Sequence, residues 1–183
     1  AMLGGETRPG AGFSYGLGSI GNNGKPKLAV PLPTLPQGAN RSDDFIPVAR
    51  IADLLLNPGA TYTYRGNERR YAAIRLVYWA GGHPFHHHQD LSKLQKAFSK
   101  PDTVIVHDSV TTATTAHADI VFPATITLER EDIGASGGDP FIVPMQKLGE
   151  ALGEARDDYE IFCDLARRLG CCDMFSERKS SQE

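Results

Sequence analysis

Residues 74–124, IRLVYWAGGHPFHHHQDLSKLQKAFSKPDTVIVHDSVTTATTAHADIVFPA, decide the fold of this chain. Three continuous apolar runs, at 74–80, 103–108 and 119–124, indicate buried strands, and each ends in a glycine pair, a polar loop or a proline. Residues 90–99, between the first two runs, place their apolar side chains on one face, which predicts a short amphipathic helix. Alternating strands and helices at this spacing predict an α/β fold, with a parallel, Rossmann-like sheet and flanking helices.

The segments on either side divide the chain into three parts. Residues 1–45 are rich in glycine, proline and asparagine, so we expect an irregular, extended segment that lies against a larger body. Residues 46–170 form the α/β domain. Residues 171–183 are polar, and we expect this tail to fray.

Three further local structures are expected inside the α/β domain. Residues 47–59 predict a helix with an apolar stripe that begins at Val48. Residues 61–71 alternate around a turn and predict a hairpin or an ordered loop. Residues 157–170 predict a second helix, whose apolar stripe runs to Leu169.

Composition excludes several classes of protein. A length of 183 residues suits one domain, and 40% hydrophobic with 22% charged residues is ordinary for a soluble globular protein. A net charge of −3 gives no electrostatic case for binding nucleic acid. No stretch approaches the ~20 apolar residues of a membrane span, so we expect no membrane partner. Cys163, Cys171 and Cys172 make neither a disulfide framework nor a CxxC metal motif, and reduced thiols favour a reducing compartment.

The loop after the first strand, GGHPFHHHQD at 81–90, is a candidate ligand site. In open parallel sheets, ligands bind beyond the carboxyl ends of the strands. The two glycines let backbone N–H groups approach a ligand, and the proline fixes the chain direction. The histidines and the glutamine offer donors and stacking faces that suit a nucleotide. A tight turn with surface histidines explains the same residues equally well.

The loop after the second strand, at 107–119, is the other candidate. Asp108 stands at the strand tip, where its carboxylate can accept hydrogen bonds from ribose hydroxyls or from the N1–H and N2–H₂ edge of guanine. Thr112 and Thr114 could bind phosphate, and capping of a short helix at 111–118 explains them at least as well. Asp119 is expected to be structural.

Several other chemistries are not supported. Three consecutive histidines cannot all face one metal ion, so no metal site is expected. The sequence has no GxGxxG, no Walker A loop and no GxSxG motif. The charged residues 129–132 are interpreted as a solvated turn.

Long motifs of this chain resemble the dimethyl sulfoxide reductase family of molybdenum oxidoreductases. The similar segments are IPVARIADLLLNPG, IRLVYWAGGHPFHHHQDL and VIVHDSVTTATTAHADIVFPATITLERED, and the branch they resemble contains trimethylamine-N-oxide and biotin sulfoxide reductases. The glycine-rich RPGAGFSYGLGSIGNNGKP and the helix EARDDYEIFCDLARRLG fit the same family in the same order. The resemblance covers residues 1–170.

This resemblance implies a role in cofactor binding. The family reduces S- or N-oxides by oxygen-atom transfer at a molybdenum held by two pterins, in bis(molybdopterin guanine dinucleotide). The serine that completes the metal's coordination has no counterpart here, so we expect an internal fragment that is inactive alone and supplies neither catalytic residues nor metal ligands. Its expected partners are the remaining domains of the parent enzyme, and the isolated chain is expected to self-associate. Relatives occur in the bacterial periplasm and cytoplasm, and the thiols favour the cytoplasm.

The resemblance also assigns the site residues. In the family, a loop that usually ends Gly-Asn-Pro and an acidic residue after the next strand hold one guanine nucleotide, so residues 46–170 are interpreted as a dinucleotide-binding domain. His83 replaces the usual asparagine, and an imidazole cannot offer the amide's donor and acceptor together. The expected cofactor-binding residues are Gly81, Gly82, His83, Pro84, His86, His88, Gln89, Asp108, Ser109 and Thr112.

Two alternatives stay open on the sequence. The chain could be a free-standing nucleotide-binding or regulatory α/β module without redox activity. It could also be a structural interaction domain whose loops bind nothing.

Overall fold

The computed structural model describes residues 38–39, 44–135 and 141–181. The extended segment expected at 1–45 therefore lies almost wholly outside the described residues. The chain divides into two compact units, of which one contains the hairpin at 132–145 and the other contains the sheet and the helices.

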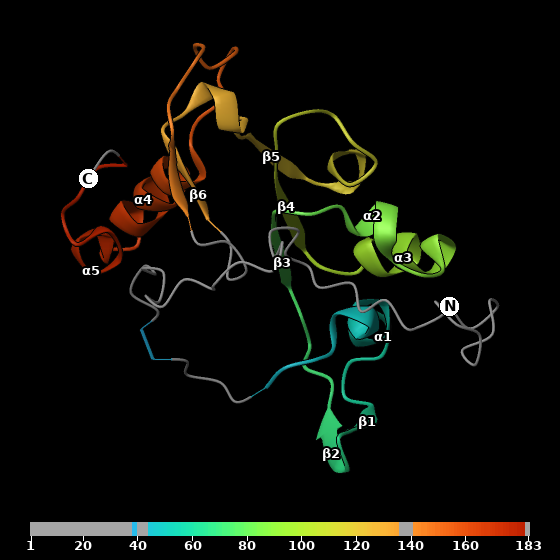
Figure 1. Ribbon diagram of the computed structural model, residues 1–183. Coiled ribbons are helices and arrows are strands. Elements are labelled where there is room, and N and C mark those ends of the chain that lie inside the picture. The colour runs from blue at the N-terminus through green and yellow to red at the C-terminus, as the bar shows by residue number, and fades with distance from the viewer. Residues whose placement is uncertain (1–37, 40–43, 136–140, 182–183) are drawn as a thin grey trace, which may run out of the picture. The chain divides into compact units, whose positions relative to one another are not determined.

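A three-stranded parallel sheet forms the centre of the larger unit (Figure 1). Its strands are β3 (Leu76–Ala80), β4 (Thr103–Asp108) and β5 (Ile120–Pro123), in the order β3-β4-β5. Ala80 pairs with His107, and Asp108 pairs with Pro123, so the strands end at one edge. The expected α/β fold with a parallel sheet and flanking helices is confirmed.

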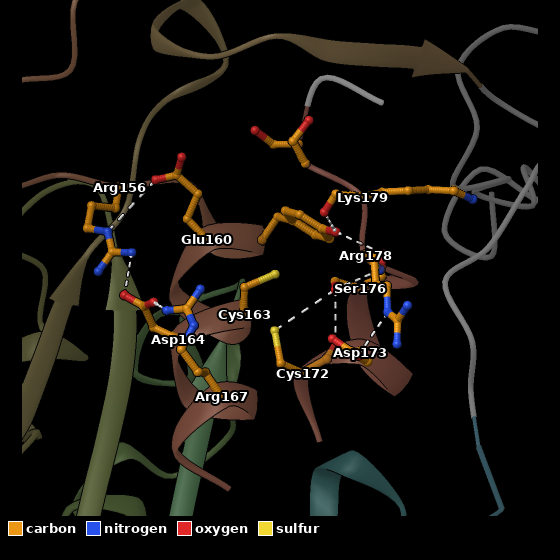
Figure 2. A pocket seen from close by; sticks show the side chains of 13 residues that line it. Arg156, Glu160, Cys163, Asp164, Arg167, Cys172, Asp173, Ser176, Arg178 and Lys179 are labelled. Atoms are coloured by element: carbon orange, nitrogen blue, oxygen red, sulfur yellow. Dashed lines mark hydrogen bonds and ion pairs between the residues drawn. The ribbon is translucent and has the colours of Figure 1, made fainter. Parts of the chain in front are cut away.

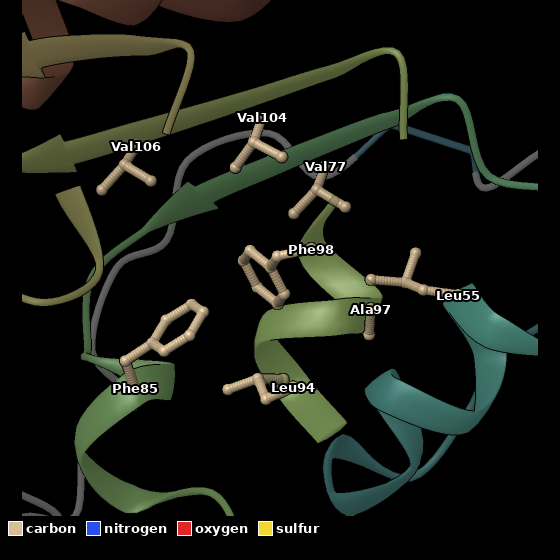
Figure 3. Close-up of a cluster of buried hydrophobic side chains, with 8 residues drawn as sticks. All are labelled: Leu55, Val77, Phe85, Leu94, Ala97, Phe98, Val104 and Val106. Atoms are coloured by element: carbon tan, nitrogen blue, oxygen red, sulfur yellow. The ribbon is translucent and has the colours of Figure 1, made fainter. Parts of the chain in front are cut away.

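The main hydrophobic core lies between one face of this sheet and two helices, α1 (Ile51–Leu56) and α3 (Leu91–Phe98) (Figure 3). The Asp90 side chain caps α3 by accepting a 3.0 Å hydrogen bond from Lys93 N. Burial of each large side chain contributes about 1.5–3 kcal/mol. The core residues are Leu55, Val77, Phe85, Leu94, Ala97, Phe98, Val104 and Val106.

Helix α4 (Asp158–Arg168) packs against side chains of β3 and β4 other than those that form the main core. Its Phe162 ring lies 5.8 Å from the Tyr78 ring and 5.1 Å from the His107 ring. The predicted helix is confirmed, but the prediction that Leu169 belongs to its apolar stripe is wrong. Leu169 follows the last helical residue, and 78% of its surface is exposed.

The tail does not simply fray, because it forms helix α5 (Cys172–Ser176). Ser176 is buried, and its hydroxyl donates to the Cys172 carbonyl at 3.0 Å and accepts from Arg178 N at 3.1 Å. The hydroxyl of Tyr159, from α4, donates to the carbonyl of Lys179 at 2.8 Å. These contacts hold the tail against α4. The polar sequence of the tail gave no indication of them.

The region before the sheet follows the prediction in part. A 3₁₀ turn, η1 (Val48–Arg50), precedes α1, and Val48 is 72% exposed rather than part of a buried stripe. Strands β1 (Thr61–Tyr64) and β2 (Asn67–Arg70) form the expected antiparallel hairpin. The ring of Tyr62 stacks on that of Tyr71 at 4.4 Å, which closes the hairpin's base.

The charged residues 129–132 are not a solvated turn. Glu129 ends the turn η3 (Thr127–Glu129), and its carboxylate accepts from Ile126 N at 3.0 Å. Arg130 is half-buried and donates to the Thr125 carbonyl at 2.5 Å. The acidic and basic side chains at this turn thus satisfy backbone groups.

In the other unit, β6 (Asp132–Ala135) and β7 (Ile142–Met145) pair as an antiparallel hairpin. This hairpin was not predicted from the sequence. Within the described ranges, no helix is long and apolar enough to cross a membrane.

Candidate functional site

The loops that follow β3 and β4 start side by side at the carboxyl edge of the sheet. Ala80 is opposite His107, so Gly81 and Asp108 leave neighbouring strands together. His83 Nδ1 lies 3.3 Å from Asp108 Oδ2. The structure therefore brings together the two loops that the sequence singled out.

The glycines of the first loop have backbone conformations that favour glycine. Gly81 has φ +83° and Gly82 has φ +76°, in the left-handed region that side chains disfavour. A Cβ on Gly81 would meet no described atom within 4 Å. The Gly82 carbonyl accepts from Trp79 Nε1 at 3.1 Å. The first loop therefore exposes an open backbone surface whose shape is fixed by the indole.

A short helix that was expected to be loop follows the glycines. Helix α2 (Pro84–His87) begins at a buried proline, and Phe85 anchors it in the core. His87 Nε2 accepts from His83 N at 3.1 Å, so the His87 imidazole satisfies the helix start. His87 was not among the expected site residues, and its spacing of four from His83 is the only sequence signal for this contact. His86 and Gln89 are exposed.

His88 packs edge-on against Trp79, with ring centroids 6.2 Å apart. Burial lowers the pKa of His88 below its ordinary value, and the neighbouring His87 lowers it further. The free energy of unfolding therefore falls as the pH drops below 6.5, because the unfolded chain then binds the proton more readily, and it levels off below the folded-state pKa.

Trp79 fluorescence reports this titration directly, because Trp79 is the chain's one tryptophan. A protonated imidazole quenches an adjacent indole, so we expect fluorescence to fall on acidification with a midpoint below 6.5. His88→Gln should remove the transition. A midpoint at or above 6.5, or a transition that survives in His88→Gln, would contradict this arrangement.

Asp108 organises the second loop from within. Its carboxylate accepts from Ser109 N at 2.8 Å and from Thr112 Oγ1 at 3.0 Å, and only 8% of the side chain is exposed. Each carboxylate oxygen still has a second lone pair. Asp108 thus shapes the loop, and its carboxylate keeps lone-pair capacity for a further donor.

The threonines of the second loop have different roles. Thr112 Oγ1 accepts from Thr115 N at 3.2 Å, and Thr115 Oγ1 accepts from Thr112 N at 2.8 Å, ahead of the short turn η2 (Thr115–His117). Thr112 thus binds the first residue of η2, whereas Thr114, the N-cap residue of that turn, makes no side-chain cap hydrogen bond. Thr114 is 1% exposed, and its Oγ1 has no hydrogen-bond partner among the described residues. Asp119 is structural, as predicted, because its carboxylate accepts from Val104 N at 2.8 Å.

Two buried polar atoms of these loops lack hydrogen bonds within the described part of the chain. They are Thr114 Oγ1 and His83 Nδ1, which is near Asp108 Oδ2 but not aligned with it as a hydrogen bond. An unsatisfied buried polar group costs about 1–3 kcal/mol. The loops therefore contain two polar atoms that their own hydrogen bonds leave unsatisfied. In the same described ranges, no three histidine, cysteine or acidic side chains are grouped to bind a metal ion.

A hydrogen-bonded chain centred on the buried His107 lies beneath this edge, and it was not predicted from the sequence. His107, 4% exposed, has its Nδ1 2.6 Å from Asp158 Oδ1 and its Nε2 2.6 Å from the Tyr78 hydroxyl. A neutral imidazole satisfies both, donating from Nδ1 to the carboxylate and accepting the Tyr78 proton at Nε2. Burial raises the pKa of Tyr78, and the Asp158 charge adds to this. The chain fixes α4 to the residue before Asp108.

Comparison with known proteins gives one consistent result. A family model described as molybdopterin oxidoreductase matches residues 8–168. Biotin sulfoxide reductase from Cereibacter sphaeroides is 48% identical, over 97% of this chain and 24% of its own length. Dimethyl sulfoxide/trimethylamine N-oxide reductase from Rhodobacter capsulatus is 41% identical, over 98% of this chain and 23% of its own.

A solved structure agrees with these sequence relatives. Acetylene hydratase from Pelobacter acetylenicus superposes with a TM-score of 0.53 and 26% identity, over 59% of this chain and 15% of that one. The chain spans about a quarter of the length of the curated relatives it matches. With the matching family model covering most of its residues, the chain belongs to the molybdopterin oxidoreductase family.

Proposed function

We propose that this chain is part of a molybdopterin-dependent S- or N-oxide reductase and helps to bind the guanosine end of a molybdopterin guanine dinucleotide. The observation that carries the proposal is the meeting of loops 81–90 and 107–119 through His83 and Asp108 at the carboxyl edge of parallel strands. This is the edge at which ligands bind in open α/β sheets.

The residues present fit such a group. The Asp108 carboxylate has lone pairs left that can accept from the guanine N1–H and N2–H₂ edge. The uncovered backbone at Gly81 allows close approach of the nucleotide. When bound, the cofactor would supply the molybdenum for oxygen-atom transfer, and the role of these residues would be to bind and orient it.

The remaining domains of a longer protein are the partners that this proposal needs. Large apolar side chains are exposed, among them Leu148 at 76%, Leu152 at 78% and Val110 at 63%. Exposed apolar surface of this kind marks contact with other protein. In isolation we expect the chain to self-associate, and to be inactive as an oxide reductase.

The proposal predicts weak, base-selective binding by the chain alone. A few hydrogen bonds at ~1 kcal/mol net each, less the cost of association, give an affinity on the order of millimolar for GDP. Trp79 fluorescence should saturate with GDP at fixed pH, and respond less to ADP. Asp108→Ala should abolish the response, whereas Asp102→Ala, which alters an exposed side chain before β4, should not. Equal responses to GDP and ADP, or unchanged binding in a folded Asp108→Ala protein, would refute it.

The glycine conformation gives a second prediction for this site. Gly81→Ala places a side chain in the left-handed region, which costs about 1–2 kcal/mol, and we expect weaker GDP binding as well as lower stability. Gly149→Ala is the matched control, because Gly149 has no positive φ and its added Cβ would meet nothing described within 4 Å. Urea denaturation and the same fluorescence titration measure both effects. Equal stability of the two variants would contradict the assigned backbone strain.

A further inference from the structure

A cavity of about 460 Å³ lies where α4 faces α5, and it is lined by two of the three cysteines (Figure 2). Cys163 comes from the middle of α4, and Cys172 is the first residue of α5. Figure 2 shows both sulfurs pointing into the space between the two helices. Both thiols are half-buried, so a small reagent can reach them.

Two hydroxyl side chains, those of Tyr159 and Ser176, line the cavity together with the two thiols. Cys172 Sγ lies 4.0 Å from Ser176 Oγ. The Tyr159 hydroxyl donates to the Lys179 carbonyl and lies 3.4 Å from the Ser176 carbonyl. The pKa of Tyr159 is raised first by burial, then by its hydrogen bond with Cys163 and by the charges of Cys163 and Cys172. Tyr159 therefore lines the same cavity as both thiols.

Charged side chains that form ion pairs also line this cavity. Asp164 on α4 pairs with Arg156 at 2.6 Å and with Arg167. Asp173 on α5 pairs with Arg178 at 2.9 Å. Each set of ion pairs lies on its own helix and flank, and the two sulfurs line the one cavity between the helices.

We propose that Cys163 and Cys172 form a redox-active thiol pair that closes to a disulfide, which makes this cavity a modification site. The oxidant is a hydroperoxide. One thiolate attacks its O–O bond and becomes a sulfenic acid, and the alkoxide or hydroxide that leaves takes up a proton. The second thiolate then attacks the sulfenic sulfur and displaces hydroxide, which is protonated to water. With hydrogen peroxide, two thiols give one disulfide and two waters.

Cys171 provides a matched control within the same chain. It precedes α5 and does not line the cavity. A bridge between Cys171 and Cys172 would close a strained ring between adjacent residues. Cys171 and Cys172 are almost equally far from Cys163 along the sequence, so sequence spacing alone would allow either to pair with it. Selective pairing with Cys172 would therefore result from the packing of the two helices.

The test is peroxide oxidation of the reduced chain, followed by alkylation of remaining thiols, trypsin digestion and mass spectrometry. Cleavage after arginine separates Cys163, in the peptide 157–167, from Cys171 and Cys172, in the peptide 169–178. We expect these peptides to be cross-linked within one monomer, with the combined mass reduced by two hydrogens. The cross-link should persist in Cys171→Ser, be lost in Cys163→Ser and Cys172→Ser, and reverse with dithiothreitol.

Three results would overturn the proposal. The first is a cross-link that persists in Cys172→Ser, which would show pairing through Cys171. The second is a product that joins two chains, and the third is oxidation of both thiols to sulfinic acids without a bridge. The outcome is independent of GDP binding, because the cavity shares no residue with loops 81–90 and 107–119.

Discussion

Replacing Phe98 with alanine is expected to lower the free energy of unfolding by about 3–5 kcal/mol. Phe98 is 4% exposed, and its ring lies 5.1 Å from the Phe85 ring and 6.2 Å from that of Trp79. The substitution removes the buried aromatic ring between α3, α2 and β3, and the loss of packing adds a cavity cost to the transfer cost. Urea denaturation followed by circular dichroism measures the change.

Leu91→Ala on the same helix is the control, because Leu91 is 45% exposed. It should cost less than about 1 kcal/mol. The Phe98 variant should also change Trp79 fluorescence, since Phe98 supports the strand that leads into the first loop. A loss below about 1.5 kcal/mol for Phe98→Ala would mean that this cluster is not the main core.

His107→Ala is expected to cost about 2–4 kcal/mol, although histidine is a polar residue. The variant leaves a cavity among three aromatic rings and removes the hydrogen-bond partner of both the Tyr78 hydroxyl and the Asp158 carboxylate. Thermal and urea unfolding measure the loss. His86→Ala is the control at an exposed histidine and should stay within about 0.5 kcal/mol of the parent.

Tyr78→Phe separates the hydrogen bond from the packing. It removes the hydroxyl but keeps the ring, and should cost about 1 kcal/mol. Equal stability of His107→Ala and His86→Ala would show that the chain from Tyr78 to Asp158 contributes nothing to the attachment of α4.

The sheet could be predicted from the sequence because its signal is local. Strand 103–108 is a continuous apolar run, and such runs are buried on both faces in parallel sheets. Strand 119–124 was also predicted to be buried, and this is wrong, because β5 stands at the end of the strand order and its Ile120 and Val121 are 44% and 42% exposed. The observed strands, Thr103–Asp108 and Ile120–Pro123, follow these runs closely. Helix α3 was predicted for the same reason, since its apolar residues recur at helical spacing.

The elements that were missed depend on contacts between distant residues. Helix α5 has a polar sequence, and its stability comes from the buried Ser176 and from Tyr159 on α4. The pairing of β6 with β7 joins two short segments whose alternation is weak. Propensity and periodicity do not register such partners.

In the candidate site, too, some features could be predicted from local sequence and others could not. The adjacency of loops 81–90 and 107–119 could be predicted, because parallel strands end at a common edge. The hydrogen bonds that Asp108 and Thr112 make within their own loop could not be predicted, because such bonds depend on the backbone geometry of the loop. In the sequence, His107 is a polar residue within an apolar strand. Its burial is explained by its hydrogen bond with Asp158, which is distant in the sequence.

The most direct test of the account maps GDP onto individual residues of the folded chain by amide NMR. We predict saturable chemical-shift changes confined to residues 81–90 and 107–115, smaller with ADP and absent in Asp108→Ala. Shifts elsewhere in the sheet, or none at several times the expected ~1 mM dissociation constant in a folded sample, would contradict a guanosine site built by these two loops.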